Sequence, residues 1–311
     1  MSIGAGNRKE RLLRQIWLHK EVYLLFLPVF LWFAIFKYAP MYGLTIAFKD
    51  YKILLGVFDS EWVGFDNFSR MFLNPAFPAA LVNTLIISAL KLVFCFPIPI
   101  IFAVLLDEMR TRLFKKVVQT TSYLPHFISW AVAAGMVGTL LNRTVGPVAA
   151  IVRAFGGTPQ NYMNDPEYFR LILVVADIWK GMGWSAIIYI AAIAGVDGQL
   201  HEAATIDGAN RFQRVIHVTL PGIRSIIAIQ LILAVGNILN SNFDQVYMMI
   251  SATTQKVGET LDYFVYRVGI NTANNFPIGT AAGLFKNIIG FVLIILTNQI
   301  SHKLTDGEGI W

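Results

Sequence analysis

The sequence predicts an all-α polytopic membrane protein with six transmembrane helices and both termini in the cytoplasm. Of its 311 residues, 56% are hydrophobic and only 14% are charged, which is too apolar for a soluble globular protein. Five or six apolar stretches are long enough to cross a bilayer, which takes about 20 residues as a helix. Lysine and arginine gather between alternate stretches, as in cytoplasmic loops. We expect one membrane domain, 21–302, between a basic N-terminal segment, 1–20, and a short tail, 303–311.

The expected spans follow one another with short or mixed-charge connections. They are approximately 22–42, 81–106, 118–141, 171–196, 223–243 and 278–300. The basic clusters are Arg8, Lys9, Arg11, Arg14 and Lys20, then Arg110, Arg112, Lys115 and Lys116, then Arg211, Arg214 and Arg224. Because all three clusters are expected inside, an even number of spans must separate them. The loops near 43–79, 143–169 and 244–277 carry mixed charge and are expected outside.

Other features narrow the class of protein. The polar lead of about 20 residues is long and no small-residue cleavage site follows the first apolar run, so we expect span one to remain. Cys95 is the single cysteine; it excludes an intrachain disulfide and is expected to be an inert packing residue. The basic residues do not form one continuous face, so no nucleic-acid partner is expected.

A polar loop at 197–222 lies between two long apolar stretches. Asp197 can cap a short helix, and Gly208 supplies the backbone freedom that a tight bend needs. Asp207 or Asn210 can cap a second short helix. Pro221 then falls in the first turn of the next span, where its missing N–H costs nothing. The loop is therefore expected to form a compact knob of two short helices.

The order of residues in this loop closely resembles the ATPase-coupling loop of binding-protein-dependent ABC importer permeases. The family pattern is Glu-Ala-Ala, three residues, Gly, nine residues, an aliphatic residue, one residue, then Leu-Pro. The matching residues are Glu202, Ala203, Ala204, Gly208, Val218, Leu220 and Pro221. Val218 is the one departure, since isoleucine is commoner there. The resemblance implies ATPase coupling by Glu202, Ala203, Ala204, Asp207, Gly208, Arg211, Leu220 and Pro221.

Further strings resemble the branch of these permeases that takes up oligosaccharides and polysaccharides. They are 36–43 with 46–51, 62–68, 178–184 and 191–193, so that the similarity runs from about residue 20 to about residue 300. The resemblance implies the fold of a type I ABC importer membrane domain in a bacterial inner membrane. It also implies four kinds of partner: a second permease subunit, two ATPase subunits, an extracytoplasmic solute-binding protein and an oligosaccharide.

The chain is expected to be a non-catalytic subunit. It has no G-x-x-x-x-G-K-[ST] phosphate loop and no His/Cys cluster with metal-ligand spacing, so ATP and Mg²⁺ are expected on the partner ATPases and no cofactor or metal on this chain. A rival hypothesis is a membrane-embedded glycosyl or lipid transferase that uses Asp177 and Asp244, and a third is a receptor or scaffold. The transferase needs convergent acids at one membrane face, which the sequence does not clearly offer.

Polar residues at membrane depth are costly and therefore mark a candidate substrate pathway. The candidates are Trp179, Lys180, Trp184, Tyr189, Asn237, Asn240, Asp244, Lys286 and Asn287. Sugars stack on aromatic rings and accept hydrogen bonds from amides and charged groups, and Lys91, Lys180 and Lys286 would suit an acidic sugar such as a uronate chain. Asp177 and Lys180 lie one turn apart and are expected to be able to pair.

The same pathway residues have an ordinary structural interpretation. Asparagine and lysine near span ends often satisfy backbone groups or extend to the interface, and tryptophan and tyrosine often anchor there. Gly279 and Gly283 permit close helix approach at the start of the last span, either to a second membrane subunit or within the chain.

Overall fold

The computed structural model describes residues 15, 17–240, 242–271 and 275–304. Apart from turns and loops, the described chain is helical except for one short ribbon, in which β1 (Lys49–Asp50) pairs antiparallel with β2 (Glu61–Trp62). The predicted all-α class is therefore confirmed. Within the described residues, four helices are long and apolar enough to cross a bilayer, or five if a helix pair bent by 65° counts as one span.

The long apolar helices match most of the predicted spans. The first is the helix Lys20–Phe48, which begins with α2 (Lys20–Phe33) and continues as a π-helix (Ala34–Tyr38) and a 3-10 helix (Ala39–Phe48). The others are α5 (Ala76–Phe94) with α6 (Pro97–Asp107), α10 (Pro166–Ala194) and α18 (Phe276–Leu304). The bent pair comprises α12 (Arg211–Arg214), a π-helix (Val215–Thr219) and α13 (Leu220–Gly222) on one side of the bend and α14 (Arg224–Gly236) on the other.

Shorter helices connect these spans. They are α3 (Gly56–Asp59), α4 (Asp66–Leu73), α7 (Arg112–Tyr123), a 3-10 turn (Leu124–Phe127), α8 (Trp130–Leu140), α9 (Pro147–Ala154), a 3-10 turn (Tyr162–Asn164), α11 (Gly198–Ile206), α15 (Phe243–Met249), α16 (Gln255–Gly258), α17 (Leu261–Tyr266) and a π-helix (Arg267–Asn271).

The third predicted span, 118–141, is not one continuous helix. It is divided into α7 and α8 by a turn that contains Pro125, whose ring and missing N–H interrupt a helix. A new helix starts after Ser129, whose hydroxyl accepts a hydrogen bond from the Val132 N–H at 3.3 Å. The fifth predicted span, 223–243, is also shorter, because α14 ends at Gly236 and Asn242 has a left-handed φ of 58°.

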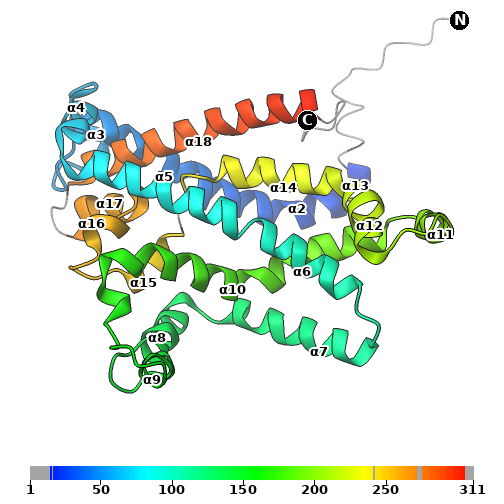
Figure 1. Cartoon of the computed structure of the whole chain (residues 1–311). Coiled ribbons are helices and arrows are strands. Elements are labelled where there is room, and N and C mark those ends of the chain that lie inside the picture. The colour runs from blue at the N-terminus through cyan, green and yellow to red at the C-terminus, as the bar shows by residue number, and fades with distance from the viewer. Residues whose placement is uncertain (1–14, 16, 241, 272–274, 305–311) are drawn as a thin grey trace, which may run out of the picture.

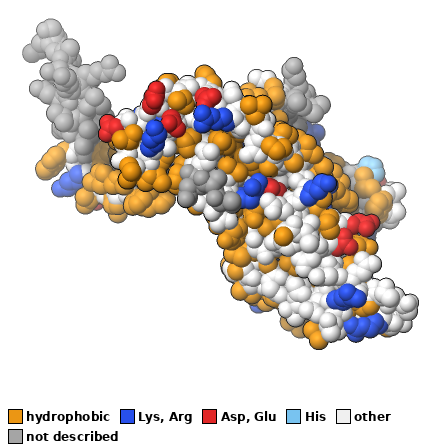
Figure 2. All heavy atoms as spheres, turned by 90° about the vertical axis from the view of Figure 1, so that its left-hand side faces the viewer, with side chains coloured by type: hydrophobic (Ala, Val, Ile, Leu, Met, Phe, Trp, Pro, Cys, Tyr) orange, Lys and Arg blue, Asp and Glu red, His pale blue; other side chains and the backbone are white. Residues whose placement is uncertain are grey.

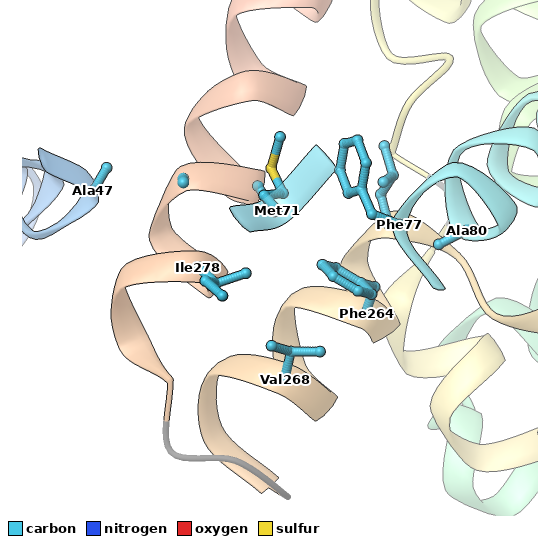
Figure 3. Packing of buried hydrophobic residues seen from close by; sticks show 10 residues of the cluster. Ala47, Met71, Phe77, Ala80, Phe264, Val268 and Ile278 are labelled. Carbon is cyan, nitrogen blue, oxygen red and sulfur yellow. The ribbon is translucent and has the colours of Figure 1, made fainter. Parts of the chain in front are cut away.

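A cluster of buried apolar side chains packs the helices together at the end of the molecule that lies opposite α11 (Figure 1). It joins α4, α5, α17 and α18, and Figure 3 shows Phe77 of α5 and Phe264 of α17 side by side. Their ring centroids are 5.7 Å apart in an edge-to-face arrangement, a favoured geometry for aromatic pairs. Met71 of α4 and Ile278 of α18 close the cluster (Figure 3).

Glycines set the closest helix contacts. A Cβ on Gly183 of α10 would collide with the backbone carbonyl of Ser122 in α7. A Cβ on Gly279 would lie 2.9 Å from the Cα of Gly269, whereas Gly283 has nothing within 4 Å. Of the two alternatives for the small-residue motif, Gly279 therefore packs within the chain.

The end of the molecule that carries α4, α16 and α17 bears charges of both signs. In Figure 1, α11 and the connection between α6 and α7 lie at one end, and α4, α16 and α17 lie at the other. Figure 2, which views the latter end, shows basic and acidic side chains interspersed among apolar ones. The mixed charge expected of the loops near 43–79 and 244–277 is thus collected on one face.

Gly183→Ala should lower the melting temperature of the purified protein and its steady-state amount in the membrane. The added methyl group must displace the α7 backbone, and overpacking of this kind costs about 1–3 kcal/mol. Gly181→Ala is the matched control, because that position on the same helix has nothing within 4 Å. Equal stability of the two variants would show that α7 can move away from α10 without loss of stability.

Candidate functional site

The loop between α10 and α14 folds into a projecting knob. Asp197 caps α11 by accepting a hydrogen bond from the Gln199 N–H at 2.9 Å. At the other end of α11, Gly208 has a φ of 81°, its N–H bonds the Thr205 carbonyl at 3.1 Å, and the Ala209 N–H bonds the Ala204 carbonyl at 2.9 Å. This pair of bonds is a Schellman motif, which terminates a helix and requires a left-handed residue at the glycine position.

A second cap follows at once. The Asn210 side chain accepts from the Gln213 N–H at 2.9 Å, and the Gln213 side chain accepts from the Asn210 N–H at 2.8 Å. This reciprocal capping box begins α12. Arg214 of α12 donates to the Thr205 hydroxyl of α11 at 3.0 Å, so the two short helices are tied together. Of the two caps predicted for this helix, the structure uses Asn210 rather than Asp207.

The tip of the knob is exposed and partly apolar. Figure 1 shows α11 extending beyond the body of the molecule. Glu202, Ala203, Asp207 and Arg211 are exposed, as the predicted coupling residues should be. Ile206 is 86% exposed and, with Leu200 and Phe212, gives the knob an apolar surface. The sequence motif does not single out Leu200, which precedes it, or Ile206, which is one of the three unspecified residues between Ala204 and Gly208.

The base of the knob is anchored in the membrane part. Leu220 packs against a buried cluster that includes Ala186, Ile193 and Ile223. Pro221 lies in α13, at the end of the helix Arg211–Gly222 and just before the 65° bend into α14, rather than in the first turn of α14. The base of the knob is thereby packed against α10 and the start of α14.

A cavity of about 750 Å³ lies above this base, between α5–α6, α10 and α14. Three of the predicted pathway residues, Trp184, Tyr189 and Asn237, line it, together with residues such as Gln230. Tyr189 is only 3% exposed, whereas Trp184 is 45% exposed. Trp184 stacks on His126 with ring centroids 4.4 Å apart and planes 1° from parallel. One aromatic face of Trp184 is therefore covered by the chain itself.

Trp179 and Lys180 lie apart from that cavity. Trp179 lines a separate groove of about 310 Å³ between α8, α9 and α10, where every lining residue is apolar. The Lys180 ammonium donates to the His126 carbonyl at 2.8 Å and lies 5.4 Å from the centre of the Trp130 ring. Lys180 thus stabilises the break between α7 and α8.

The predicted pairing of Asp177 with Lys180 is wrong. Asp177 pairs instead with Lys91 of α5, at 3.3 Å. Lys91 also donates to the Gln245 side chain at 2.6 Å, and Gln245 donates to the Leu173 carbonyl at 2.7 Å. Asp177 pairs with Lys91 rather than with Lys180 because the Lys91 contacts join three helices. They also leave the fully buried Gln245 side chain with both a donor and an acceptor contact.

A chain of polar contacts, here called the amide ladder, continues from Asn237 at the cavity edge. The Asn237 side-chain oxygen accepts from Asn240 at 3.0 Å, and the Asn240 oxygen accepts from Lys286 at 2.8 Å. Lys286 also pairs with Asp262 of α17. The ladder thus comprises Asn237, Asn240, Lys286 and Asp262. Asp262 was not among the predicted residues, because no local pattern marks it within the segment 244–277.

The remaining predicted residues do not join the ladder. Asp244 on α15 and Asn287 on α18 are exposed. Because Asp177 is held by Lys91, the acids proposed for a transferase do not form an unpaired couple. Among the described residues, no three His, Cys, Asp or Glu side chains lie close enough to hold a metal ion.

Comparisons with known proteins agree with this architecture. The family model of the binding-protein-dependent transport system inner membrane component matches residues 95–306. The polygalacturonan/rhamnogalacturonan transport system permease protein YteP of Bacillus subtilis is 43% identical over 98% of this chain and 94% of its own length. The arabinooligosaccharide transport system permease protein AraP of Bacillus subtilis is 27% identical over 92% of this chain and 90% of its own length.

A solved structure has the same fold. A chain of a bacterial ABC transporter involved in the import of the acidic polysaccharide alginate superposes with a TM-score of 0.88 and 36% identity, over 95% of this chain and 99% of that chain. The resemblance seen in the loop 197–222 is thereby confirmed over nearly the whole sequence. The chain belongs to the family of binding-protein-dependent transport system inner membrane components, and it is a permease subunit of an ABC sugar importer.

Proposed function

We propose that this chain forms half of the translocation path for an acidic oligosaccharide, such as a uronate oligomer, that a solute-binding protein delivers. The observation that carries the proposal is the continuity of the cavity with the amide ladder through Asn237. Trp184 supplies a half-exposed aromatic surface, and the ladder supplies amides and a cation. These are the groups that orient a polar ligand in an otherwise apolar site.

The relatives support an acidic substrate. YteP is named for polygalacturonan and rhamnogalacturonan transport, and the alginate importer of similar fold was also solved with a periplasmic protein that holds an alginate pentasaccharide. In this chain Lys286 is the cation of the ladder, with a side chain only 12% exposed. A substrate carboxylate would share Lys286 with Asp262, and charge-assisted contacts of this kind are stronger than neutral ones.

The partners follow from the shape of the chain and from its family. The other half of the path is a second permease subunit, and two ATPase subunits that bind ATP and Mg²⁺ receive the knob. The apolar tip residues Leu200, Ile206 and Phe212 suit a groove on such an ATPase, since exposed apolar side chains of this size mark contact surfaces. The helix α2 has no buried residue within this chain, so its packing partners are lipid and other subunits.

The proposed topology has six crossings with both termini inside the cell. Besides the four long helices and the bent pair, the sixth crossing is the broken segment α7–α8. It places the basic connection 107–117 and the knob on one side of the membrane, at the same end of the molecule in Figure 1, as the positive-inside rule requires.

Reporter fusions should place residues 1–20, 107–117, 197–222 and 301–311 in the cytoplasm. The reason is the three clusters of lysine and arginine, which should all lie inside, so that six crossings return residues 301–311 to the same side. Fusions within 143–169 should report the opposite side. A knob segment found outside the cell would contradict both the topology and the ATPase contact.

Gly208→Val should abolish substrate-stimulated ATP hydrolysis by the assembled importer while the protein still inserts in the membrane. A β-branched residue at a φ of 81° destabilises the bend by roughly 1–2 kcal/mol and turns α12 away from α11. Glu202→Lys should have the same effect by reversing a charge on the docking surface. Gly198→Ala is the control, because an added Cβ there meets nothing within 4 Å. If both variants keep full substrate-stimulated ATP hydrolysis, the knob has no part in the coupling of transport to the ATPase.

Lys286→Gln should raise KM for a uronate oligomer more than for the same oligomer with its carboxylates reduced to alcohols. Loss of one charge-assisted hydrogen bond costs about 1.5–3 kcal/mol, which is roughly a 10- to 100-fold change in KM. The single variant also leaves the Asp262 carboxylate unpaired. The Lys286→Gln/Asp262→Asn double variant removes that charge, so its KM reports the loss of the contact between Lys286 and the substrate alone.

The matched control for that experiment is Lys52→Gln, since Lys52 forms an exposed pair with Asp50 away from the ladder. Equal losses for the charged and the reduced oligomer in the double variant would exclude Lys286 as the group that recognises the acid.

A further inference from the structure

Four aromatic rings form a patch beside the amide ladder. Tyr247 of α15 lies at the centre, with ring centroids 5.3 Å from Phe243, 5.1 Å from Tyr266 and 6.4 Å from Tyr263. The hydroxyl groups of Tyr247 and Tyr266 are 3.4 Å apart. We call these four residues the tyrosine patch. Its rings come from α15 and α17, two short helices that the cavity does not include.

The patch is not part of the sealed core. Along α17, Leu261 and Phe264 are fully buried, whereas Tyr263 and Tyr266 are only partly buried. Tyr247 is 40% exposed. Burial and a neighbouring carboxylate, Glu259, raise the pKa of Tyr263 above its ordinary value. The Tyr263 phenol is therefore neutral at physiological pH, and it keeps an O–H donor as well as acceptor lone pairs.

The position of the patch continues the proposed path. Asp262, the last member of the ladder, lies one helical turn before Tyr266 on α17, so the two side chains share a face. Asn240, which accepts from Lys286, lies three residues before Phe243. Along the chain the order is cavity, ladder and patch, from Asn237 through Asn240 to Phe243, and α17 stands at the end of the molecule opposite α11 (Figure 1).

We infer that the tyrosine patch is a second sugar subsite, which holds the outer units of an acidic oligosaccharide whose inner unit lies at the ladder. The inference rests on the proposed function. The apolar C–H face of a pyranose ring stacks on an aromatic face, and the phenol groups donate to and accept from its hydroxyls. Neutral phenols can also donate to a carboxylate without the cost of burying a second cation. Two adjoining subsites recognise the length of a substrate as well as its charge.

The test is uptake by the complete importer of uronate oligomers of increasing length. Tyr247→Ala and Tyr266→Ala should each raise KM for the long oligomers about three- to tenfold, the value of one aromatic contact. The disaccharide, which reaches only the ladder, should keep its wild-type KM. Tyr266→Phe preserves the ring and should have a smaller effect than Tyr266→Ala, and Tyr266→Trp should restore the long oligomer. Tyr38→Ala is the control, because Tyr38 is an exposed tyrosine of the first span.

The outcomes separate this inference from the proposed function. If the wild-type importer takes up no uronate oligomer, the proposed function fails. If wild-type uptake is normal but the alanine variants lose long and short oligomers equally, or lose the protein from the membrane, the patch is packing and the inference is overturned. A KM change that grows with oligomer length supports the subsite.

Discussion

The structure depends on one requirement: a polar group at membrane depth must find its partner within the protein. Lys91, Asp177 and Gln245 satisfy one another across three helices. Lys180 donates to a carbonyl at a helix break, and Lys286 is held by Asp262. These contacts tie together elements that apolar packing alone would leave free to slide, and they fix where the cavity and the ladder can lie.

The same requirement explains the broken helices. A span interrupted at Pro125 or at Gly236 leaves backbone carbonyls without helical donors, so side chains take their place. The Lys180 ammonium does so for His126, and the Asn237 side-chain amide adds a bond at 2.9 Å to the Leu233 carbonyl, which also accepts from the Asn237 backbone N–H. Polar residues therefore gather at the breaks, and one of them, Asn237, also lines the cavity.

Local patterns in the sequence were enough to predict the class, most of the spans and the knob. The caps at Asp197 and Asn210 and the left-handed Gly208 are short-range features, and short-range physics determines them. The match of Glu202 to Pro221 with the family pattern then identified the protein. The break at Pro125 was missed because the apolar run continues through it, and hydropathy does not detect a single imino acid.

The pairing of charges could not be predicted in the same way. Asp177 and Lys180 are close in sequence, but Lys91 is brought to Asp177 only by the packing of α5 on α10. Asp262 lies in the short helix α17, and nothing local shows that it meets Lys286. Trp179 and Trp184 are five residues apart on α10 and face different hollows. Which polar residues share a site is a property of the tertiary fold.

The ion pair of Lys286 with Asp262 has a consequence for a charged polymer that moves along the proposed path. An unpaired lysine would be a deep electrostatic well, and the first carboxylate to enter would stop there. A lysine that keeps its own counter-ion offers a shallow site, in which each arriving carboxylate exchanges with Asp262 and is replaced in turn by the next. Passage requires sites that bind firmly enough to admit a charge and weakly enough to release it. The built-in carboxylate makes Lys286 a site of that shallow kind.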